Sequence, residues 1–400
     1  MTTPHPDTSQ APAAVARVLE QLTDAQRELR RRIEALVDAV SPQPQALALD
    51  RDKRFDGGLR DALAQAGVLG LGLPEEAGGR GGSTVEQAVA LEVLGRKATS
   101  MAVYCVVSFL VTRMLRHFGT PPQRSAWLAP LLQGRAQAAF CLTEEAGGTD
   151  ILANTRTTAR RTGQGWLLHG EKTWISGAAD SQLLLVVART AEHRTRGLTV
   201  FAVPGDAPGV RVSRLPTMAL NGYASCQVAF DEVALPADAV VGEVDAGLQH
   251  IMTALNGERI NAAAVTNGVA RGALEAALAR VRDRAAFGKP LGQFQAVQHR
   301  LAACAMQIEL AWSAVLEAAR RDAAGEATDV LSGMAKLASS KAALATTDAG
   351  MELMAAAGFL EQEPMQRYFR DARLHVFAPV NNDMVLNLLG ERWLGLPRAY

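Results

Sequence analysis

One short stretch of the chain gathers residue types that bind polar ligands. It reads Phe140-Cys141-Leu142-Thr143-Glu144-Glu145-Ala146-Gly147-Gly148-Thr149-Asp150. Adjacent glycines let backbone N–H groups turn toward a ligand, and the hydroxyls of Thr143 and Thr149 can donate or accept hydrogen bonds. Such a loop suits the polar edge of a flat heterocycle or a phosphate. Taken alone, however, an ordinary strand–turn–strand with Gly and Thr in turn positions is the better interpretation.

A second stretch, Gly170-Glu171-Lys172-Thr173-Trp174-Ile175-Ser176-Gly177, follows after one strand-like run. In this order and spacing, the two stretches resemble the two flavin-binding signatures of the acyl-CoA dehydrogenase family. The resemblance implies that the first stretch binds the pyrimidine side of FAD and the start of the substrate's thioester arm. The matching residues for FAD are Phe140, Leu142, Thr143, Gly148 and Thr149, and Thr149 is also assigned to the substrate.

The second stretch matches the family as Trp174, Ile175 and Ser176. The resemblance places Trp174 at the edge of the flavin and the Ser176 hydroxyl within reach of the ring nitrogens. The alternative for Trp174 is a core aromatic next to a turn. The family usually has Pro at the position of Glu145 and Ser at that of Thr149, so the hydroxyl is kept and the loop is expected to differ only in stiffness.

A third match is Arg284-Ala285-Ala286-Phe287-Gly288-Lys289-Pro290-Leu291, followed by Phe294-Gln295. In the family this segment helps to hold the FAD pyrophosphate and adenosine across a subunit boundary. Arg284 would supply a fork that matches a phosphate, Phe287 a stacking or packing face, and Gln295 an amide. The resemblance therefore implies a homo-oligomer, and we expect a homotetramer made of two dimers.

The fourth segment, Met351-Glu352-Leu353-Met354-Ala355-Ala356-Ala357-Gly358-Phe359, departs from the family pattern. Relatives have a Gln and a Gly-Gly-Asn run around FAD at this place, where this chain has Glu352, Ala355, Ala356 and Ala357. Alanine restricts the approach of the backbone, and a carboxylate is a different group from an amide. FAD binding is still expected, with Glu352, Ala355 and Ala356 as altered contacts.

The segment after Leu374, where many family members have their catalytic base, also differs from the family pattern. After Arg370-Asp371-Ala372-Arg373-Leu374 many relatives continue to Glu-Gly-Thr, in which the Glu is the base, but a gapless match puts Pro379 at this position. Asp383 is a nearby carboxylate that is expected in the first turn of the next helix. The tail of the chain therefore offers no direct replacement for the missing Glu.

Glu258 is the candidate that replaces it. It occupies one slot of an apolar stripe with three- and four-residue spacing, which predicts a shared helix face: Leu248, Ile251, Leu255, Ala262, Val265 and Val269. Burial there would raise the pKa of the carboxyl group, which suits a proton acceptor. From periodicity alone, the role of base and the role of an ion-pair partner of Arg259 are equally well supported for Glu258. Resemblance favours the base, because branched- and long-chain members carry their catalytic Glu on this helix directly before the Arg; Asn256 and Arg259 match the thioester-arm contacts.

The resemblance thus implies FAD-dependent α,β-dehydrogenation of an acyl thioester, carried by CoA or by an acyl-carrier protein. Glu258 would take the α proton, flavin N5 would take the hydride, and an electron-transfer flavoprotein would reoxidise the flavin. Two alternatives remain open. The same fold could act as a flavin oxidase, a monooxygenase or a thioester desulfinase, or the chain could be a non-catalytic partner subunit.

The elements that must position these residues change character along the chain. Helices are expected at 15–40, 55–67, 84–118 (with a possible break near Gly95) and 123–133, strands at 166–169, 183–188, 198–203, 210–212 and 227–230, and helices again at 247–284, 295–323, 328–357 and 381–394. The expected fold is α+β: an N-terminal all-α domain (1–136), a central β-barrel or sheet domain (137–245) and a C-terminal four-helix bundle (246–400), as in acyl-CoA dehydrogenases.

Composition sets broad limits on function. Hydrophobic residues make up 48% of the chain, and 41 basic residues balance 41 acidic ones, which gives no electrostatic case for nucleic acid. The four cysteines form no CxxC and the histidines have no ligand spacing, so reduced core thiols and no metal are expected. The longest apolar run, 101–111, is too short for a bilayer, and residues 1–14 read as a disordered tail without a signal core. The cytoplasm is the expected location.

Overall fold

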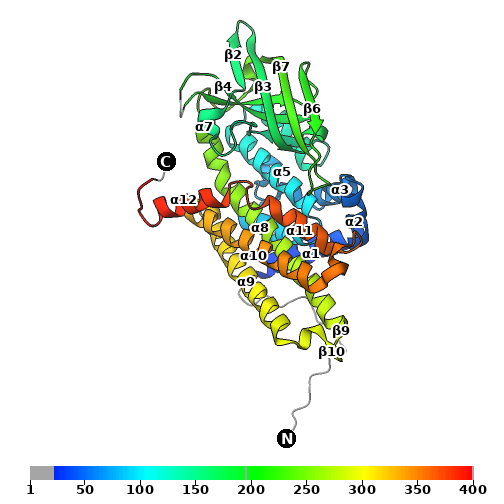
Figure 1. Ribbon diagram of the computed structural model, residues 1–400. Coiled ribbons are helices and arrows are strands. Elements are labelled where there is room, and N and C mark those ends of the chain that lie inside the picture. The colour runs from blue at the N-terminus through cyan, green and yellow to red at the C-terminus, as the bar shows by residue number, and fades with distance from the viewer. Residues whose placement is uncertain (1–21, 194–195, 399–400) are drawn as a thin grey trace.

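The structure is a computed structural model that describes residues 22–193 and 196–398. A β-sheet domain lies at one end of the molecule, and helices from both ends of the sequence pack together beneath it (Figure 1). The N-terminal helices are α1 (Asp24–Val40), α2 (Gln43–Arg51), α3 (Gly57–Gln65), α4 (Thr84–Lys97), α5 (Thr99–Phe118) and α6 (Pro121–Leu132). The predicted helix over 15–40 therefore holds from Asp24; its first part and the predicted disordered tail lie outside the described residues.

The long helical region over 84–118 is two helices, and the break is at Ala98 rather than near Gly95. Gly95 instead allows α4 to pack closely on a C-terminal helix, because a Cβ atom there would lie 2.2 Å from the carbonyl oxygen of Val265. Helix α2 was not predicted. Pro42 is its N-cap and Pro44 lies in its first turn, where a proline needs no N–H partner.

The central domain is one mixed sheet with strand order β6-β7-β3-β2-β4-β5-β8, and β1 pairs with β4. Its strands are β1 (Ala138–Cys141), β2 (Thr158–Thr162), β3 (Gly165–Ser176), β4 (Leu183–Arg189), β5 (Leu198–Pro204), β6 (Val210–Arg214), β7 (Ser225–Pro236) and β8 (Val240–Val241). Strands β1, β2 and β8 were not predicted. Strand β1 is parallel to β4 and ends inside the first motif, with Phe140 opposite Leu185.

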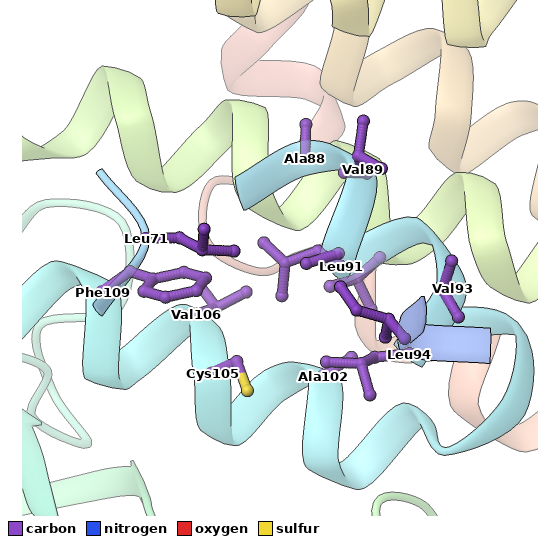
Figure 2. Packing of buried hydrophobic residues seen from close by; sticks show 14 of the residues in the cluster. Leu71, Ala88, Val89, Leu91, Val93, Leu94, Ala102, Cys105, Val106 and Phe109 are labelled. Carbon is purple, nitrogen blue, oxygen red and sulfur yellow. The ribbon is translucent and has the colours of Figure 1, made fainter. Parts of the chain in front are cut away.

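The C-terminal helices are α8 (Gly247–Asp283), α9 (Gln295–Ala323), α10 (Asp329–Met354), α11 (Pro364–Leu374) and α12 (Asn382–Arg392). Helix α8 runs through the centre of the molecule and contacts α4, α5, α9, α10 and α11. One hydrophobic core contains side chains of α4, α5, α8 and α9, so the first and last thirds of the chain share an interior. Figure 2 shows how the side chains of α4 and α5 meet within this core. Helix α11 was not predicted, because its stretch contains mainly polar residues.

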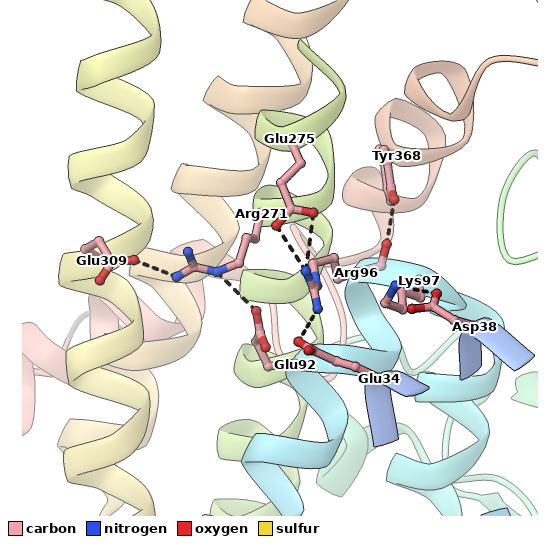
Figure 3. Close-up of polar contacts among 9 residues, drawn as sticks. All are labelled: Glu34, Asp38, Glu92, Arg96, Lys97, Arg271, Glu275, Glu309 and Tyr368. Atoms are coloured by element: carbon pink, nitrogen blue, oxygen red, sulfur yellow. Dashed lines mark hydrogen bonds and ion pairs between the residues drawn. The ribbon is translucent and has the colours of Figure 1, made fainter. Parts of the chain in front are cut away.

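Buried charges tie the same helices together. The guanidinium of Arg271 lies 3.1 Å from Glu92 and 2.6 Å from Glu309, which joins α8 to α4 and α9 (Figure 3). Arg96 contacts Glu34 and Glu275 in the same region, and Tyr368 donates a hydrogen bond to the carbonyl oxygen of Arg96. Buried charges are tolerated where they are paired and hydrogen-bonded, as here.

Among the described residues, two helices, α5 and α9, are long and apolar enough to cross a membrane by length and composition alone. Helix α5 contains the apolar run 101–111 and extends past it at both ends, whereas α9 mixes apolar and small residues. Of their apolar windows, 67% and 50% are buried inside the fold, as in core helices. All four cysteines are buried and free, and the described residues contain no group of three or more His, Cys, Asp or Glu that could hold a metal ion.

Candidate active site

The second motif lies at the end of β3, where the strand is irregular. The pairing with β7 shifts register between Lys172 and Ile175, and Trp174 has a φ of +61° in between. Its side chain is 59% exposed, so Trp174 is not a core aromatic. Ile175 is buried opposite Cys226, which leaves only its backbone available to a ligand, and Ser176 is half-buried opposite Ser225.

The first motif is held directly against the second. The Thr143 hydroxyl donates to the carbonyl oxygen of Thr173 at 2.6 Å, and the Thr173 N–H donates back to the carbonyl oxygen of Thr143 at 3.0 Å. Phe140 and Leu142 are half-buried against the core beneath the sheet, and Gly148 and Thr149 lie exposed in the turn that follows. The structure thus brings the two predicted flavin motifs together, although 30 residues separate the bonded threonines.

Glu144 and Lys172 are the site residues to which the sequence analysis gave no role. Lys172 is fully buried, and its ammonium lies 2.8 Å from the carboxylate of Glu144 and 3.0 Å from the carbonyl oxygen of Leu142. Burial alone would raise the pKa of Glu144, but Lys172 and the N–H groups of Arg156 and Thr157 hold that pKa below its usual value. The sequence contained a signal for this pair, because the first motif includes the acidic Glu144 and the second includes the basic Lys172.

Glu258 lies on α8 one turn after Ala254, and the side chain is half-buried. Within the described residues its carboxylate has no hydrogen bond and no ion pair; Arg259 donates instead to the side-chain oxygen of Asn256 at 2.9 Å. Burial raises the pKa of Glu258 to about 7, against a weaker opposing effect of the Arg259 charge. A carboxyl group with this pKa can gain and lose a proton near neutral pH.

The third motif does not join the first two within one chain. Arg284 and Gln295 are exposed on either side of a hairpin of β9 (Ala285–Ala286) and β10 (Lys289–Pro290). Phe287, at the turn, has a φ of +50° and is 95% exposed. This hairpin lies at the opposite end of the molecule from the sheet domain (Figure 1). A single chain therefore leaves the predicted FAD contacts in two separate places.

The fourth segment follows the end of α10. Glu352 is exposed and forms an ion pair with Arg300, which also lies 3.8 Å from Asp348. This arginine lowers the pKa of Glu352, first through a hydrogen bond and then through its charge. Ala355 has a φ of +51° and ψ of −136°, a conformation that glycine adopts far more readily, and Ala356 is exposed next to it.

The tail segment offers no carboxylate between His375 and Asn382. Asp383 is exposed in the first turn of α12, where its N–H group donates to the Asn381 side chain at 2.9 Å. The buried Lys336 binds the carbonyl oxygen of Val376 at 3.3 Å and the Asn382 side chain at 2.7 Å. The tail is thus fastened to α10 by a cation and not by an acidic group.

The first two motifs fit a flavin on their own geometry. An exposed tryptophan held at positive φ offers a flat face or edge, and it stands beside a loop whose backbone is fixed by hydrogen bonds. Polar groups on a fixed backbone next to an aromatic surface suit a planar heterocycle with hydrogen-bonding edges. The core against which Phe140 and Leu142 pack also contains Ile251 and Ala254 of α8, the helix that carries Glu258.

Family models cover nearly the whole chain. The acyl-CoA dehydrogenase N-terminal domain matches residues 23–135, the middle domain matches 139–233 and the C-terminal domain matches 245–394. The chain belongs to the acyl-CoA dehydrogenase family. An acyl-CoA dehydrogenase is an oxidoreductase that acts on CH–CH donors and depends on FAD, so the predicted class of enzyme and the predicted cofactor are confirmed.

Individual relatives agree with this assignment. Acyl-CoA dehydrogenase fadE12 of Mycobacterium bovis is 35% identical over 84% of this chain and 87% of its own length. The 3-sulfinopropanoyl-CoA desulfinase of Paraburkholderia xenovorans is 32% identical over 90% of this chain and 93% of its own. Butyryl-CoA dehydrogenase from Megasphaera elsdenii superposes with a TM-score of 0.90 at 28% identity, covering 94% and 99% of the two chains. The predicted three-part fold is confirmed by this superposition.

Proposed function

We propose that this acyl-CoA dehydrogenase removes the α proton and the β hydride of an acyl thioester, with Glu258 as the base. The observation that carries the proposal is the Glu258 carboxylate, which has no hydrogen bond or ion pair within the described residues and a pKa raised to about 7. A base of this kind is matched to the weakly acidic carbon next to a thioester carbonyl. Pro379 stands where many relatives have their base, so the chain needs a carboxylate elsewhere.

Bound FAD supplies the acceptor for the β hydride. We assign its binding to Phe140, Leu142, Thr143, Gly148 and Thr149 of the first motif and Trp174, Ile175 and Ser176 of the second. Within this set, Ile175 acts through its backbone and Trp174 through its exposed ring. Thr143 positions the loop through its bond to Thr173, so its remaining capacity for a ligand lies in the backbone and in the lone pairs of the hydroxyl.

The substrate's thioester arm is assigned to Thr149, Asn256 and Arg259. Arg259 is held by Asn256 on the same helix, next to the base, so its remaining N–H donors are oriented without an ion pair to Glu258. An oriented guanidinium can bind polar or phosphate groups of the arm. The arm belongs to CoA or to an acyl-carrier protein, since both contain pantetheine.

We propose a homotetramer in which one subunit completes the FAD site of another. Arg284, Phe287, Gln295, Glu352, Ala355 and Ala356 are the residues assigned to the neighbouring site. The support is the distance of the β9–β10 hairpin from the sheet domain of its own chain, together with the exposure of Phe287 (Figure 1). An electron-transfer flavoprotein is the proposed electron acceptor, and the cytoplasm is the proposed location.

The test is Glu258→Gln, measured by the reduction of FAD with a panel of acyl thioesters in the absence of oxygen. The variant should keep its yellow colour and thioester binding but lose flavin reduction, because glutamine cannot accept the proton. Asp383→Asn is the matched control and should reduce at the wild-type rate. The reverse result, reduction by Glu258→Gln and none by Asp383→Asn, would move the base to the tail.

A second candidate reaction is suggested by the desulfinase relative, which is 32% identical over most of the chain. If this chain shared that activity, a 3-sulfinopropanoyl thioester would release sulfite without net reduction of an electron acceptor. Assaying sulfite release and dye reduction on the same preparation separates the two reactions. An oxidase would instead consume oxygen rapidly after reduction by the substrate.

A further inference from the structure

The ion pair of Glu144 and Lys172 has no part in the proposed proton transfer, yet it lies directly behind the loop assigned to FAD. The Lys172 side chain is 0% exposed and the Glu144 side chain 8%. The lysine lies two residues before Trp174, and its ammonium binds both Glu144 and the carbonyl oxygen of Leu142. Burying two charges costs free energy that a hydrophobic pair would not, so the pair calls for an explanation beyond packing.

Three separate segments meet at this pair. Glu144 accepts hydrogen bonds from the N–H groups of Arg156 at 2.7 Å and Thr157 at 3.0 Å, just before β2. Lys172 reaches it from β3, and Glu144 itself belongs to the loop after β1. With the bond between Thr143 and Thr173, the pair fixes the first motif relative to the second on two sides.

We propose that Lys172 and Glu144 are positioning residues for FAD, because they hold the backbone of Leu142 and Thr143 beside Trp174. Their opposite charges also offset each other in the electrostatic potential at the pyrimidine side of the flavin. This rests on the proposed placement of the first two motifs at FAD. Reduction adds electron density to the pyrimidine side of a flavin, so a nearby positive charge raises the midpoint potential and a negative charge lowers it.

The two single substitutions should therefore act alike on binding and in opposite directions on potential. Lys172→Met leaves the negative charge of Glu144 without a partner. Glu144→Gln leaves the positive charge of Lys172 without a partner. In both, the dissociation constant of FAD from the reconstituted protein should rise roughly tenfold or more, because breaking a buried pair loosens the loop. The midpoint potential of the bound FAD should fall in Lys172→Met and rise in Glu144→Gln.

The conditions must keep the remaining group charged. Lys172→Met is compared with wild type at about pH 8.5 and Glu144→Gln at about pH 6, since burial disfavours either charge on its own. The double variant Glu144→Gln/Lys172→Met should return the potential to near the wild-type value while FAD stays weakly bound. If a single variant does not fold, the remaining single variant and the double variant still give the comparison.

Glu145→Gln is the matched control, because Glu145 is the exposed neighbour in the same loop and loses the same charge. It should keep both FAD affinity and potential, since solvent screens an exposed charge. Shifts of potential in the same direction in both single variants, or unchanged FAD affinity, would overturn the inference. A wild-type protein that binds no FAD would overturn the proposed function instead, so the two failures are distinguishable.

Discussion

Glu258 and Arg259 are neighbours in sequence, but their charges are not paired with each other. Arg259 turns back along α8 and donates to the side-chain oxygen of Asn256 at 2.9 Å. Within residues 22–193 and 196–398, the Glu258 carboxylate has neither a hydrogen bond nor an ion pair. In this described part of the chain, the arrangement leaves the carboxylate without a partner and the guanidinium held beside it by Asn256.

The pH dependence of activity should report this carboxylate. Burial raises the pKa of Glu258 to about 7, and only the deprotonated form accepts a proton. The value of kcat/KM should therefore rise with pH through about 7 and level off above it. Asp383→Asn should leave this rise of kcat/KM with pH unchanged. A limb near the ordinary carboxyl value of 4.5 would exclude Glu258 as the base.

The same pKa makes a prediction about stability. A carboxyl group whose pKa is raised in the folded state binds its proton more tightly there than in the unfolded chain. Its stabilising contribution is complete below the ordinary value of 4.5 and is lost as the pH rises through about 7. Glu258→Gln should therefore raise the melting temperature of the FAD-free protein more at about pH 8 than at about pH 5. An equal change at both pH values would contradict the burial of the charge.

Sharing of sites between subunits can be tested by complementation. Arg284→Ala should weaken FAD binding to the neighbouring site, and Glu258→Gln should inactivate its own. In a mixed dimer of the two variants, one site would have both native residues, so co-expression should restore about a quarter of wild-type activity under random pairing. Mixing Arg284→Ala with Arg284→Ala/Glu258→Gln provides the control. No recovery in a protein proven to contain mixed dimers would place Arg284 and Glu258 in the same subunit's site.

Ala355 offers a stabilising substitution. Its φ of +51° costs an alanine side chain free energy that glycine avoids, and this exceeds the extra entropy that glycine loses on folding. Ala355→Gly should therefore raise the unfolding free energy by roughly 1 kcal/mol. Ala356→Gly, at the next position, has no positive φ to relieve and should lower the melting temperature. Thermal unfolding of the two variants side by side checks the prediction.

Features with a local cause could be predicted from the sequence. The helix face around Glu258 follows from three- and four-residue spacing. Helix α9 was predicted with its observed bounds, Gln295–Ala323. The flavin motifs are short runs whose residue types are visible without the fold. The absence of a glutamate between His375 and Asn382 can likewise be read directly from the sequence.

The tertiary structure decided what depends on distant segments. Glu144 and Lys172 are 28 residues apart, and only the pairing of the strands around them makes each the partner of the other. Gly95 was expected near a helix break because glycine lowers helix propensity. In the structure this position requires glycine because α8 packs so closely that a side chain would not fit. Whether Glu258 pairs with Arg259 could not be decided from adjacency, because side chains one residue apart on a helix point in different directions and their partners are set by packing.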